Sequence, residues 1–462
     1  MISGLTDWRP QPLTGKQIAQ AHSIASVALQ RLADALLQPM ILLPAIVWLL
    51  NGSYVDIAII TVVASGSSAF GGIVMPYILY LLEDVRVVIL GANVVRAAAA
   101  ALIVVLGWRA ASFEQADFVS LLIISVVFYE LGSAVNITTN PRSTIANLDQ
   151  PTSIRSRQTA GALAGILGGL IAWSTLSNDA LTFPRSAGWL LVLGGIASIS
   201  SVWFQLTAPI RRDMLYHKPS FVGFEDIQAL VRLGNVRRFI YFRLVFGLAA
   251  LADPFLIIYG IMQMGLNLAY VGATVLVLAI SQVIGGVVWT VFRKARGSRR
   301  SMQIAALLRL AGISLAMGVP IVADSSAYAE RFDSQTPGSW LFVFAFALLG
   351  LGQSTYLRNE RPYAIRIAGD QSLYPAAIML TNFTMLVTAI SAMVGAWIIG
   401  AWSLETAMVT AAMVAFIALL MSGLLIGRRT LRRRALSPTL RGSRKPIRVR
   451  RRRLFGRRRS RK

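Results

Sequence analysis

Long apolar stretches recur along almost the whole chain, separated by short polar segments. A helix needs about 20 apolar residues to cross the hydrocarbon core of a bilayer. The pattern therefore predicts an all-α polytopic membrane protein with twelve transmembrane helices. The predicted spans are 26–50, 56–82, 87–107, 117–139, 158–176, 186–208, 238–262, 268–292, 300–322, 340–358, 373–400 and 402–427.

Lys and Arg are distributed unevenly among the segments that connect these spans. With the N-terminus inside, 20 of them fall in the inner segments and three, Arg109, Arg185 and Arg331, in the outer loops. Positively charged loops are retained on the cytoplasmic side of a membrane. The distribution thus predicts a multi-pass protein of the cell (plasma or inner) membrane, with both termini in the cytoplasm.

The composition excludes several classes of protein. Only 14% of the residues are charged and 55% are hydrophobic, whereas soluble domains carry about 25% charged residues. The chain has no cysteine and only two histidines, His22 and His217, so disulfides and a histidine metal site are not expected. It also lacks the phosphate-loop, zinc-protease and nucleophile-elbow motifs. We expect no enzyme activity and no cofactor.

The net charge of +25 is concentrated at the C-terminus. Residues 428–462 hold 18 of the 45 Lys and Arg residues and no acidic residue. Such a run of like charge is expected to be disordered in isolation and to bind anionic lipid in a salt-dependent manner. Binding to nucleic acid or the ribosome, and a role in gating, are less favoured alternatives.

The chain divides around one long internal connection. Its apolar residues recur at helical spacing, which predicts an amphipathic helix on the membrane surface. These apolar residues are Phe221, Phe224, Ile227, Leu230 and Val231. The predicted parts are a cytoplasmic arm 1–24, a six-helix half 25–208, the central loop 209–237, a second six-helix half 238–427 and the basic tail 428–462.

The two halves share features at nearly constant offsets of 213–221 residues. The matched features are Ser67–Gly72 with Ser281–Gly286, Tyr54-Val55 with Tyr270-Val271, Gln38-Pro39 with Asp253-Pro254, Arg96 with Arg309, and Pro141 and Asp149-Gln150 with Pro362 and Asp370-Gln371. Two parallel six-span repeats are a transporter architecture, with the substrate site near the midplane between them.

These features resemble the major facilitator superfamily over residues 25–427. The family's signature loop, G-x-x-x-D-R-x-G-R-R, follows the second span of each half. The second copy here keeps basic residues at Arg296, Arg299 and Arg300, and the first copy, around Arg86, is more eroded. Because this loop helps to hold the outward-facing state in the family, the resemblance implies a gating role for these four residues.

A run of small residues occupies the fifth predicted span, from Gly161 to Gly169. Part of it is similar to the antiporter motif of the same family, G-P-x-x-G-G, with Ala164-Gly165 in place of Gly-Pro. Close helix packing is the favoured interpretation, since small residues four apart let helix backbones approach. The similarity nevertheless suggests an exporter of small organic molecules.

Ionisable residues inside a membrane are costly and are therefore paired or functional. The predicted spans contain Arg31, Asp34, Arg96, Glu130, Arg243, Asp253 and Arg309. Arg31 and Asp34 share one helix face, with Gln38 one turn beyond, so Asp34 either pairs with Arg31 or binds a proton or cation. Asp253 lies in mid-span beside Pro254, with no basic residue within one turn, and is a coupling candidate unless another span supplies its partner.

The remaining candidates come from the spans that line the central cavity in the resembled family. Glu130 and Asn136 lie in the fourth span, and a salt bridge from Glu130 to Arg96 is the structural alternative. Gln353 and Tyr356 offer polar groups from the tenth span.

Two arginines of the spans have simpler interpretations. Arg243 is close enough to a predicted span end to reach the interface. Arg309, like Arg96, is expected to have a scaffold role.

Two functional hypotheses follow. The first is a secondary transporter of the major facilitator type, in which protonation of Asp253, Asp34 or Glu130 couples proton movement to a small-molecule substrate. The second is a non-transporting membrane scaffold whose basic tail binds anionic lipid or nucleic acid.

Overall fold

The computed structural model describes residues 15–81, 85–112, 114–145, 151–207, 222–332 and 334–425. Every regular element within these ranges is a helix, which confirms the all-α class. The basic tail, most of the predicted N-terminal arm and about half of the predicted central loop lie outside the described residues. The described helices belong to one compact unit, Met1–Leu425.

The helices fall into two groups along the chain, which we call the N-terminal and C-terminal helices. The N-terminal helices are α1 (Gly15–Leu36), α2 (Leu42–Leu49), α3 (Tyr54–Leu81), α4 (Val85–Trp108), α5 (Gln115–Ile145), α6 (Pro151–Leu176) and α7 (Arg185–Leu206). The C-terminal helices are α8 (Phe224–Val231), α9 (Gly234–Leu248), the 3-10 helix η2 (Ala249–Phe255), α10 (Leu256–Met264), α11 (Leu268–Arg296), α12 (Ser298–Ala323), α13 (Ser326–Ala329), α14 (Thr336–Ala368), the 3-10 helix η3 (Gln371–Leu373), α15 (Tyr374–Ala401) and α16 (Leu404–Ser422).

Eleven segments of the described chain are long and apolar enough to cross a membrane. The first predicted span, 26–50, is wrong as a single helix, because the helix starts at Gly15 and is broken between α1 and α2. The carbonyl of Gln38 accepts hydrogen bonds from the backbone N–H groups that open α2. Pro39 has no N–H group and disfavours a helical residue before it, which explains the break. A count of twelve crossings therefore stays a prediction.

The predicted span 238–262 is also irregular in its middle. It consists of α9, η2 and α10, and the tightened 3-10 segment contains Asp253 and Pro254. The irregularity expected from Pro254 is thus present. Gln38-Pro39 and Asp253-Pro254 hold matching places in the sequence repeat, so both halves of the chain interrupt a helix at the same point.

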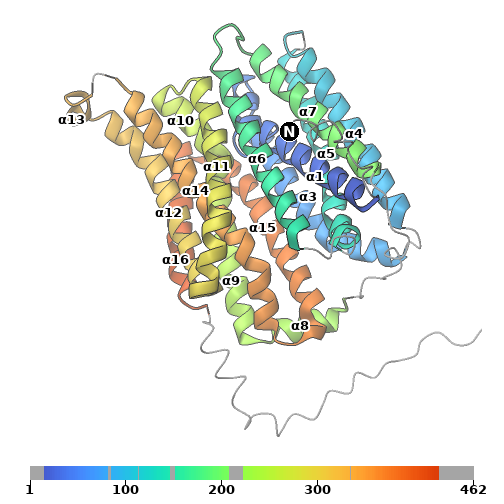
Figure 1. Ribbon diagram of the computed structural model, residues 1–462. Helices are drawn as coiled ribbons and strands as arrows, with labels where there is room; N and C mark the ends of the chain where they lie inside the picture. The colour runs from blue at the N-terminus through green and yellow to red at the C-terminus, as the bar shows by residue number, and fades with distance from the viewer. Residues whose placement is uncertain are drawn as a thin grey trace, which may run out of the picture. The chain divides into compact units, whose positions relative to one another are not determined.

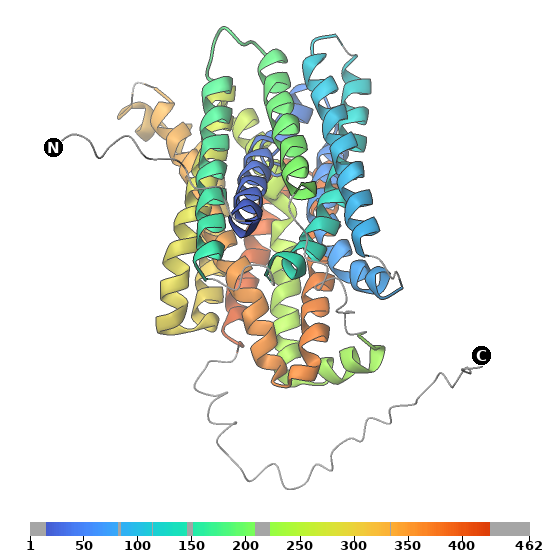
Figure 2. The same cartoon turned by 45° about the vertical axis from the view of Figure 1, so that its right-hand side comes forward.

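The helices pack side by side in two clusters. Figure 1 shows α3, α4, α5 and α7 on one side and α10, α12, α14 and α16 on the other, with α6 and α15 between them. Figure 2 shows α1 between α6 and α7, which are its main partners. The most extensive contacts between the N-terminal and C-terminal helices are those of α3 with α15 and of α6 with α11.

Close backbone contact at α6 explains its run of small residues. A Cβ atom on Gly169 would lie 2.7 Å from the Cα atom of Leu276 in α11, and one on Gly168 would lie 2.7 Å from the Cβ atom of Ala35 in α1. In the reverse direction, a Cβ atom on Gly272 would lie 2.6 Å from the Cα atom of Trp173. The favoured interpretation of the fifth span, helix packing, is therefore supported.

The predicted surface helix of the central loop is present as α8. Its placement differs from the expectation, because Leu230 is buried. Leu230 lines a small cavity together with residues of α9, α14 and α15, and Phe224 at the start of the helix is exposed. The apolar face of α8 thus packs at least partly against protein, because neighbouring helices offer it an apolar surface.

Candidate functional site

The charged candidate side chains inside the bundle, with their polar and aromatic neighbours, form two separate sets. The first, which we call the N-terminal polar group, comprises Gln30, Arg31, Asp34, Arg96, Tyr129, Glu130 and Ser198 from α1, α4, α5 and α7. The second, which we call the ion-pair ladder, comprises Arg243, Phe246, Asp253, Arg309, Tyr356 and Glu360 from α9, η2, α12 and α14. Five of the candidate coupling residues from the sequence belong to these sets: Arg31, Asp34 and Glu130 to the first, and Asp253 and Tyr356 to the second.

Arg31 and Asp34 in α1 form the accessible ion pair of the N-terminal polar group. Their side chains are three residues apart on one helix face, as the sequence predicts. The Arg31 Nη1 atom lies 3.9 Å from Asp34 Oδ2, and the side chains are 63% and 41% exposed. A charge-assisted hydrogen bond measures about 2.7–2.9 Å, so this pair is loose.

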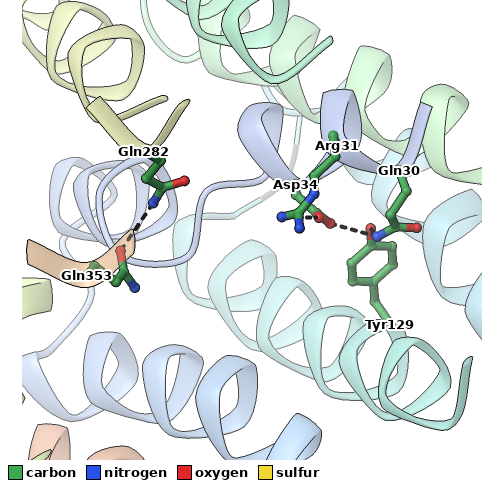
Figure 3. A network of polar contacts seen from close by, with 6 residues as sticks. All are labelled: Gln30, Arg31, Asp34, Tyr129, Gln282 and Gln353. Carbon is green, nitrogen blue, oxygen red and sulfur yellow. Dashed lines mark hydrogen bonds and ion pairs between the residues drawn. The ribbon is translucent and has the colours of Figure 1, made fainter. Parts of the chain in front are cut away.

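Gln30 connects Asp34 to the buried centre of α5. Its Nε2 atom donates to Asp34 Oδ1 at 2.6 Å and lies 3.4 Å from the Tyr129 hydroxyl (Figure 3). Within the described chain, the buried Oε1 atom of Gln30 has no hydrogen-bond partner. The carboxylate of Asp34 is therefore held on one oxygen, and its other oxygen faces only the distant Arg31.

Arg96 in α4 packs over the ring of Tyr129. Its guanidinium carbon is 5.4 Å from the centroid of the Tyr129 ring, and its Nη2 atom donates to the Ser198 hydroxyl at 3.2 Å. Arg96 is almost completely buried. A ring face and a hydroxyl thus stabilise this charge without a carboxylate at salt-bridge distance.

Glu130 is half-buried and follows Tyr129 in α5. The ion pairs found in the described residues are Arg31–Asp34, Arg243–Glu360 and Arg309–Asp253. The predicted alternative, a salt bridge from Glu130 to Arg96, is therefore wrong for this structure. The side chain of Asn136, the other candidate of this helix, lies outside the described residues.

Asp253 is closely paired, by a residue of a different helix. Arg309 Nη2 of α12 lies 2.5 Å from Asp253 Oδ1, and the two side chains are 11% and 16% exposed. This is the alternative that the sequence left open, a basic partner from another span. This pairing accords with the scaffold role expected for Arg309, which stays a prediction.

Arg243 and Glu360 form a second closed pair, between α9 and α14. Their side chains are only 2% and 4% exposed, so the expectation that Arg243 reaches the interface is wrong. The sequence missed Glu360 because the predicted span ended at residue 358, whereas α14 continues to Ala368. A signal was available in the sequence, because the helical spacing of Tyr356, Glu360 and Tyr363 continues past residue 358. All three residues are buried in the structure.

Two stacked rings join the closed pairs into one ladder. Phe246 and Tyr356 lie 4.3 Å apart at 22°. The Arg243 guanidinium carbon is 5.8 Å from the Tyr356 centroid, and that of Arg309 is 5.3 Å from the Phe246 centroid. Tyr356, predicted as a cavity group, is therefore buried between cationic and aromatic neighbours and tied to the framework of the C-terminal helices.

Gln353 lies one turn before Tyr356 and has different neighbours. It accepts a hydrogen bond of 3.1 Å from Gln282 of α11, and its own Nε2 atom lies 3.9 Å from the sulfur of Met40. Figure 3 shows this amide pair on one side and the residues of α1 and α5 on the other. Gln38 precedes Met40 in the break after α1 and contributes its backbone carbonyl to the start of α2.

Of the four arginines predicted to form a gating loop, the side chains of Arg86 and Arg296 lie outside the described part of the structure. Arg299 Nη2 donates to the carbonyl of Gly423 at 2.8 Å, and Arg300 is exposed. The Arg299 contact satisfies a carbonyl at the end of α16 and joins the start of α12 to it.

No protein-family profile matches the sequence, and no curated protein sequence matches it either. Solved structures match the fold. A variant of the nucleoside transporter NupG superposes with a TM-score of 0.64 at 14% identity, covering 88% of this chain and 100% of that one. A POT family transporter in complex with a thioalcohol-conjugated peptide gives 0.60 at 12% identity, with 87% and 94% covered.

A bacterial homologue of the iron transporter ferroportin, in an inward-facing state, gives a TM-score of 0.58 at 13% identity, with 88% and 98% covered. Likeness at these identities concerns the fold. The chain thus has the fold of these membrane transporters, with eleven described helical segments long and apolar enough to cross a membrane, as the sequence resemblance implied.

Proposed function

We propose that the chain is a secondary transporter that moves a small molecule across the cell membrane by alternating access, with proton coupling at the N-terminal polar group. The observation that carries this proposal is the exposed and loosely held Arg31–Asp34 pair. The two other ion pairs of the described chain are closed, so this pair is the one that a solute can reach.

Two carboxylates of the N-terminal polar group, Asp34 and Glu130, lack a close ion pair within the described residues, and we propose that they exchange protons. Asp34 has one oxygen that is only loosely held, and Glu130 has no ion pair within the described residues. Protonation of either carboxylate would remove a negative charge close to the buried Arg96. The electrostatic potential at the N-terminal polar group would then differ between its protonated and ionised states. The affinity for the solute would therefore depend on protonation.

Alternating access needs two bodies that move against each other, and the packing supports such a division. The α3–α15 and α6–α11 pairs join the two clusters. At α6–α11 the backbones approach each other closely at Gly169 and Gly272. We propose that these two surfaces carry the rocking motion of the halves 25–208 and 238–427.

Transport in proteoliposomes under an imposed pH gradient tests the function. Uridine and a mixture of dipeptides are suitable first solutes, because the fold neighbours include a nucleoside transporter and a peptide-bound transporter. Asp34→Asn and Glu130→Gln should reduce gradient-driven uptake or efflux at least tenfold. Glu225→Gln, which changes an exposed acid of α8, is the matched control and should leave transport unchanged.

Solute-dependent proton movement should be seen with the native chain and with a chain lacking residues 428–462. If neither moves a solute or a proton, the scaffold hypothesis replaces the transporter. The sign of the pH gradient that drives accumulation decides between import and the proposed export.

The proposed orientation places both termini in the cytoplasm and the basic tail at the anionic inner leaflet. A tag at residue 462 and one in the 209–237 loop should be protected in intact cells, and a tag near Asn51 should be accessible. A peptide of residues 428–462 should bind anionic vesicles, weaken steeply with salt and ignore neutral vesicles. Equal binding to both kinds of vesicle would contradict the electrostatic account.

A further inference from the structure

The chemistry of the exposed pair indicates what kind of solute the site takes. Resting on the proposed function, we infer that the substrate is a small zwitterion whose carboxylate binds Arg31 and whose ammonium group binds Asp34. The inference depends on the unused hydrogen-bonding capacity of these two side chains, on the charge balance of the N-terminal polar group and on the exposure of the pair.

Arg31 and Asp34 do not satisfy each other. Their 3.9 Å separation leaves room for ligand atoms to engage each side chain at normal hydrogen-bond length. Asp34 Oδ1 is held by Gln30, so the carboxylate is oriented while Oδ2 is open to a donor. The guanidinium of Arg31 offers a planar fork that suits a carboxylate.

The aliphatic part of the Arg31 side chain packs against α6. A Cβ atom on Gly161 of α6 would lie 3.2 Å from Arg31 Cγ, so the stem of the arginine runs along the surface of α6. The stem is therefore supported while the side chain as a whole is 63% exposed. A supported stem and an exposed head are what a binding arginine needs, because less entropy is lost when the ligand arrives.

When all four charges of the N-terminal polar group are present, their balance favours a ligand without net charge. Arg31 and Arg96 carry two positive charges, and Asp34 and Glu130 carry two negative charges when ionised. A monoanion or monocation would add one uncompensated charge to this balanced group, which is less favourable than adding none. A zwitterion adds no net charge. Its carboxylate would face Arg31 and its ammonium group would face Asp34, so that each charge lies beside an opposite one.

A neutral solute gains less from the same geometry. It would replace water at Arg31 and Asp34 without supplying opposite charges, and hydrogen bonds to neutral groups are weaker than charge-assisted ones. The neutral amides Gln282 and Gln353 already bond to each other, so they offer fewer free groups to such a solute. The site thus favours a zwitterion over an uncharged polar molecule of equal size.

Matched ligands that differ only in charge test the inference. Glycine, leucine and leucyl-leucine are the zwitterions, their N-acetyl forms the anions, their C-terminal amides the cations, and the N-acetyl amides the neutral forms. Binding to the full chain in detergent is measured by thermal shift and by inhibition of uptake in proteoliposomes. At least one zwitterion should bind at least tenfold more tightly than its three relatives.

Two variants should change the charge selectivity in opposite directions. In Arg31→Gln, the C-terminal amide should bind more tightly than the zwitterion, because the ammonium site remains and the carboxylate site is lost. In Asp34→Asn, the N-acetyl form should bind more tightly than the zwitterion. Arg238→Gln, another exposed arginine, is the control and should keep the native order.

Folding of each variant is checked by its thermal unfolding without ligand. If Arg31→Gln does not fold, Arg31→Lys keeps the charge and should retain the zwitterion preference with weaker affinity. A neutral form that binds as tightly as its zwitterion, or a selectivity that neither variant alters, would overturn the inference.

The failure of this inference can be told apart from failure of the proposed function. Transport of uridine without binding of any zwitterion would leave the transporter in place and remove the substrate class. If no compound of either set is moved, the proposed function itself falls.

Discussion

The N-terminal polar group and the ion-pair ladder both contain arginines and carboxylates, but they differ in how closely these side chains are paired and in how exposed they are. In the ladder, both arginines have a carboxylate partner, and no charged side chain is more than 16% exposed. In the N-terminal polar group, the pair Arg31–Asp34 is loose and exposed. Arg96 and Arg309 hold matching places in the sequence repeat, yet Arg309 has Asp253, whereas Arg96 has a ring and a hydroxyl.

This difference separates a framework from a reactive site. A buried pair that loses one member leaves an uncompensated charge, so the ladder ties α9, η2, α12 and α14 into one arrangement. A loose pair can exchange its partner for water, a proton or a ligand at small cost. We therefore expect the C-terminal helices to act as a rigid body and, under the proposed function, the N-terminal helices to carry the groups that respond to solute.

The largest effect on stability is expected from breaking the more buried pair of the ladder. Glu360→Gln would leave Arg243 without its counter-charge in the bundle, and the free energy of unfolding should fall by about 3–5 kcal/mol. Thermal unfolding in detergent and recovery of monodisperse protein measure this loss.

The control for Glu360→Gln is the double variant Arg243→Met/Glu360→Gln. Removing both charges should restore part of the stability, because no uncompensated charge remains. A single variant that is as stable as the native protein would show that the pair does not hold α9 to α14.

The next largest effect is expected where the two clusters touch. Gly169→Ala would place a Cβ atom 2.7 Å from a backbone atom of α11, so α6 must shift, at a cost of about 1–3 kcal/mol. Gly165→Ala on the same helix meets no atom within 4 Å and is the matched control. Equal melting temperatures for the two variants would contradict the contact through Gly169.

Local patterns in the sequence predicted much of the framework. Hydropathy predicted the long helices, because lipid imposes the same requirement on each of them. The spacing of Arg31 and Asp34 predicted their shared face, since three residues on a helix fix that relation. Pro39 and Pro254 marked the two interruptions, because proline lacks the N–H group that a regular helix needs.

Partners from distant parts of the chain could not be predicted in the same way. The repeat aligned Arg309 with Arg96 but gave no information on which acid either would meet. Glu360 lay beyond the predicted end of its span, because hydropathy detects lipid-facing residues and misses a polar continuation that neighbouring helices bury. Such pairs depend on how helices pack against one another, which no single helix encodes.

A smaller effect is expected at the start of α12. Arg299→Ala would remove the hydrogen bond to the carbonyl of Gly423 at the exposed end of α16, at a cost of about 0.5–1.5 kcal/mol. Arg300→Ala changes the neighbouring exposed arginine and should leave the melting temperature unchanged. A drop of equal size in both variants would point to a loss of general positive charge at this end, and the specific contact would then be unimportant.

The smallest effect on stability is expected at Asp34, and it sharpens the contrast between the two regions most directly. Asp34→Asn and Asp253→Asn make the same chemical change. Because Asp34 is exposed and loosely paired, its loss should lower the free energy of unfolding by less than about 1 kcal/mol. Asp253→Asn leaves Arg309 buried beside a neutral amide and should cost several times more. Thermal unfolding of the two variants, set beside gradient-driven transport, separates the roles. We expect Asp34→Asn to unfold like the native chain and to lose transport. Similar destabilisation by both variants would contradict the division into a framework and a reactive site, since Asp34 would then be structural as well.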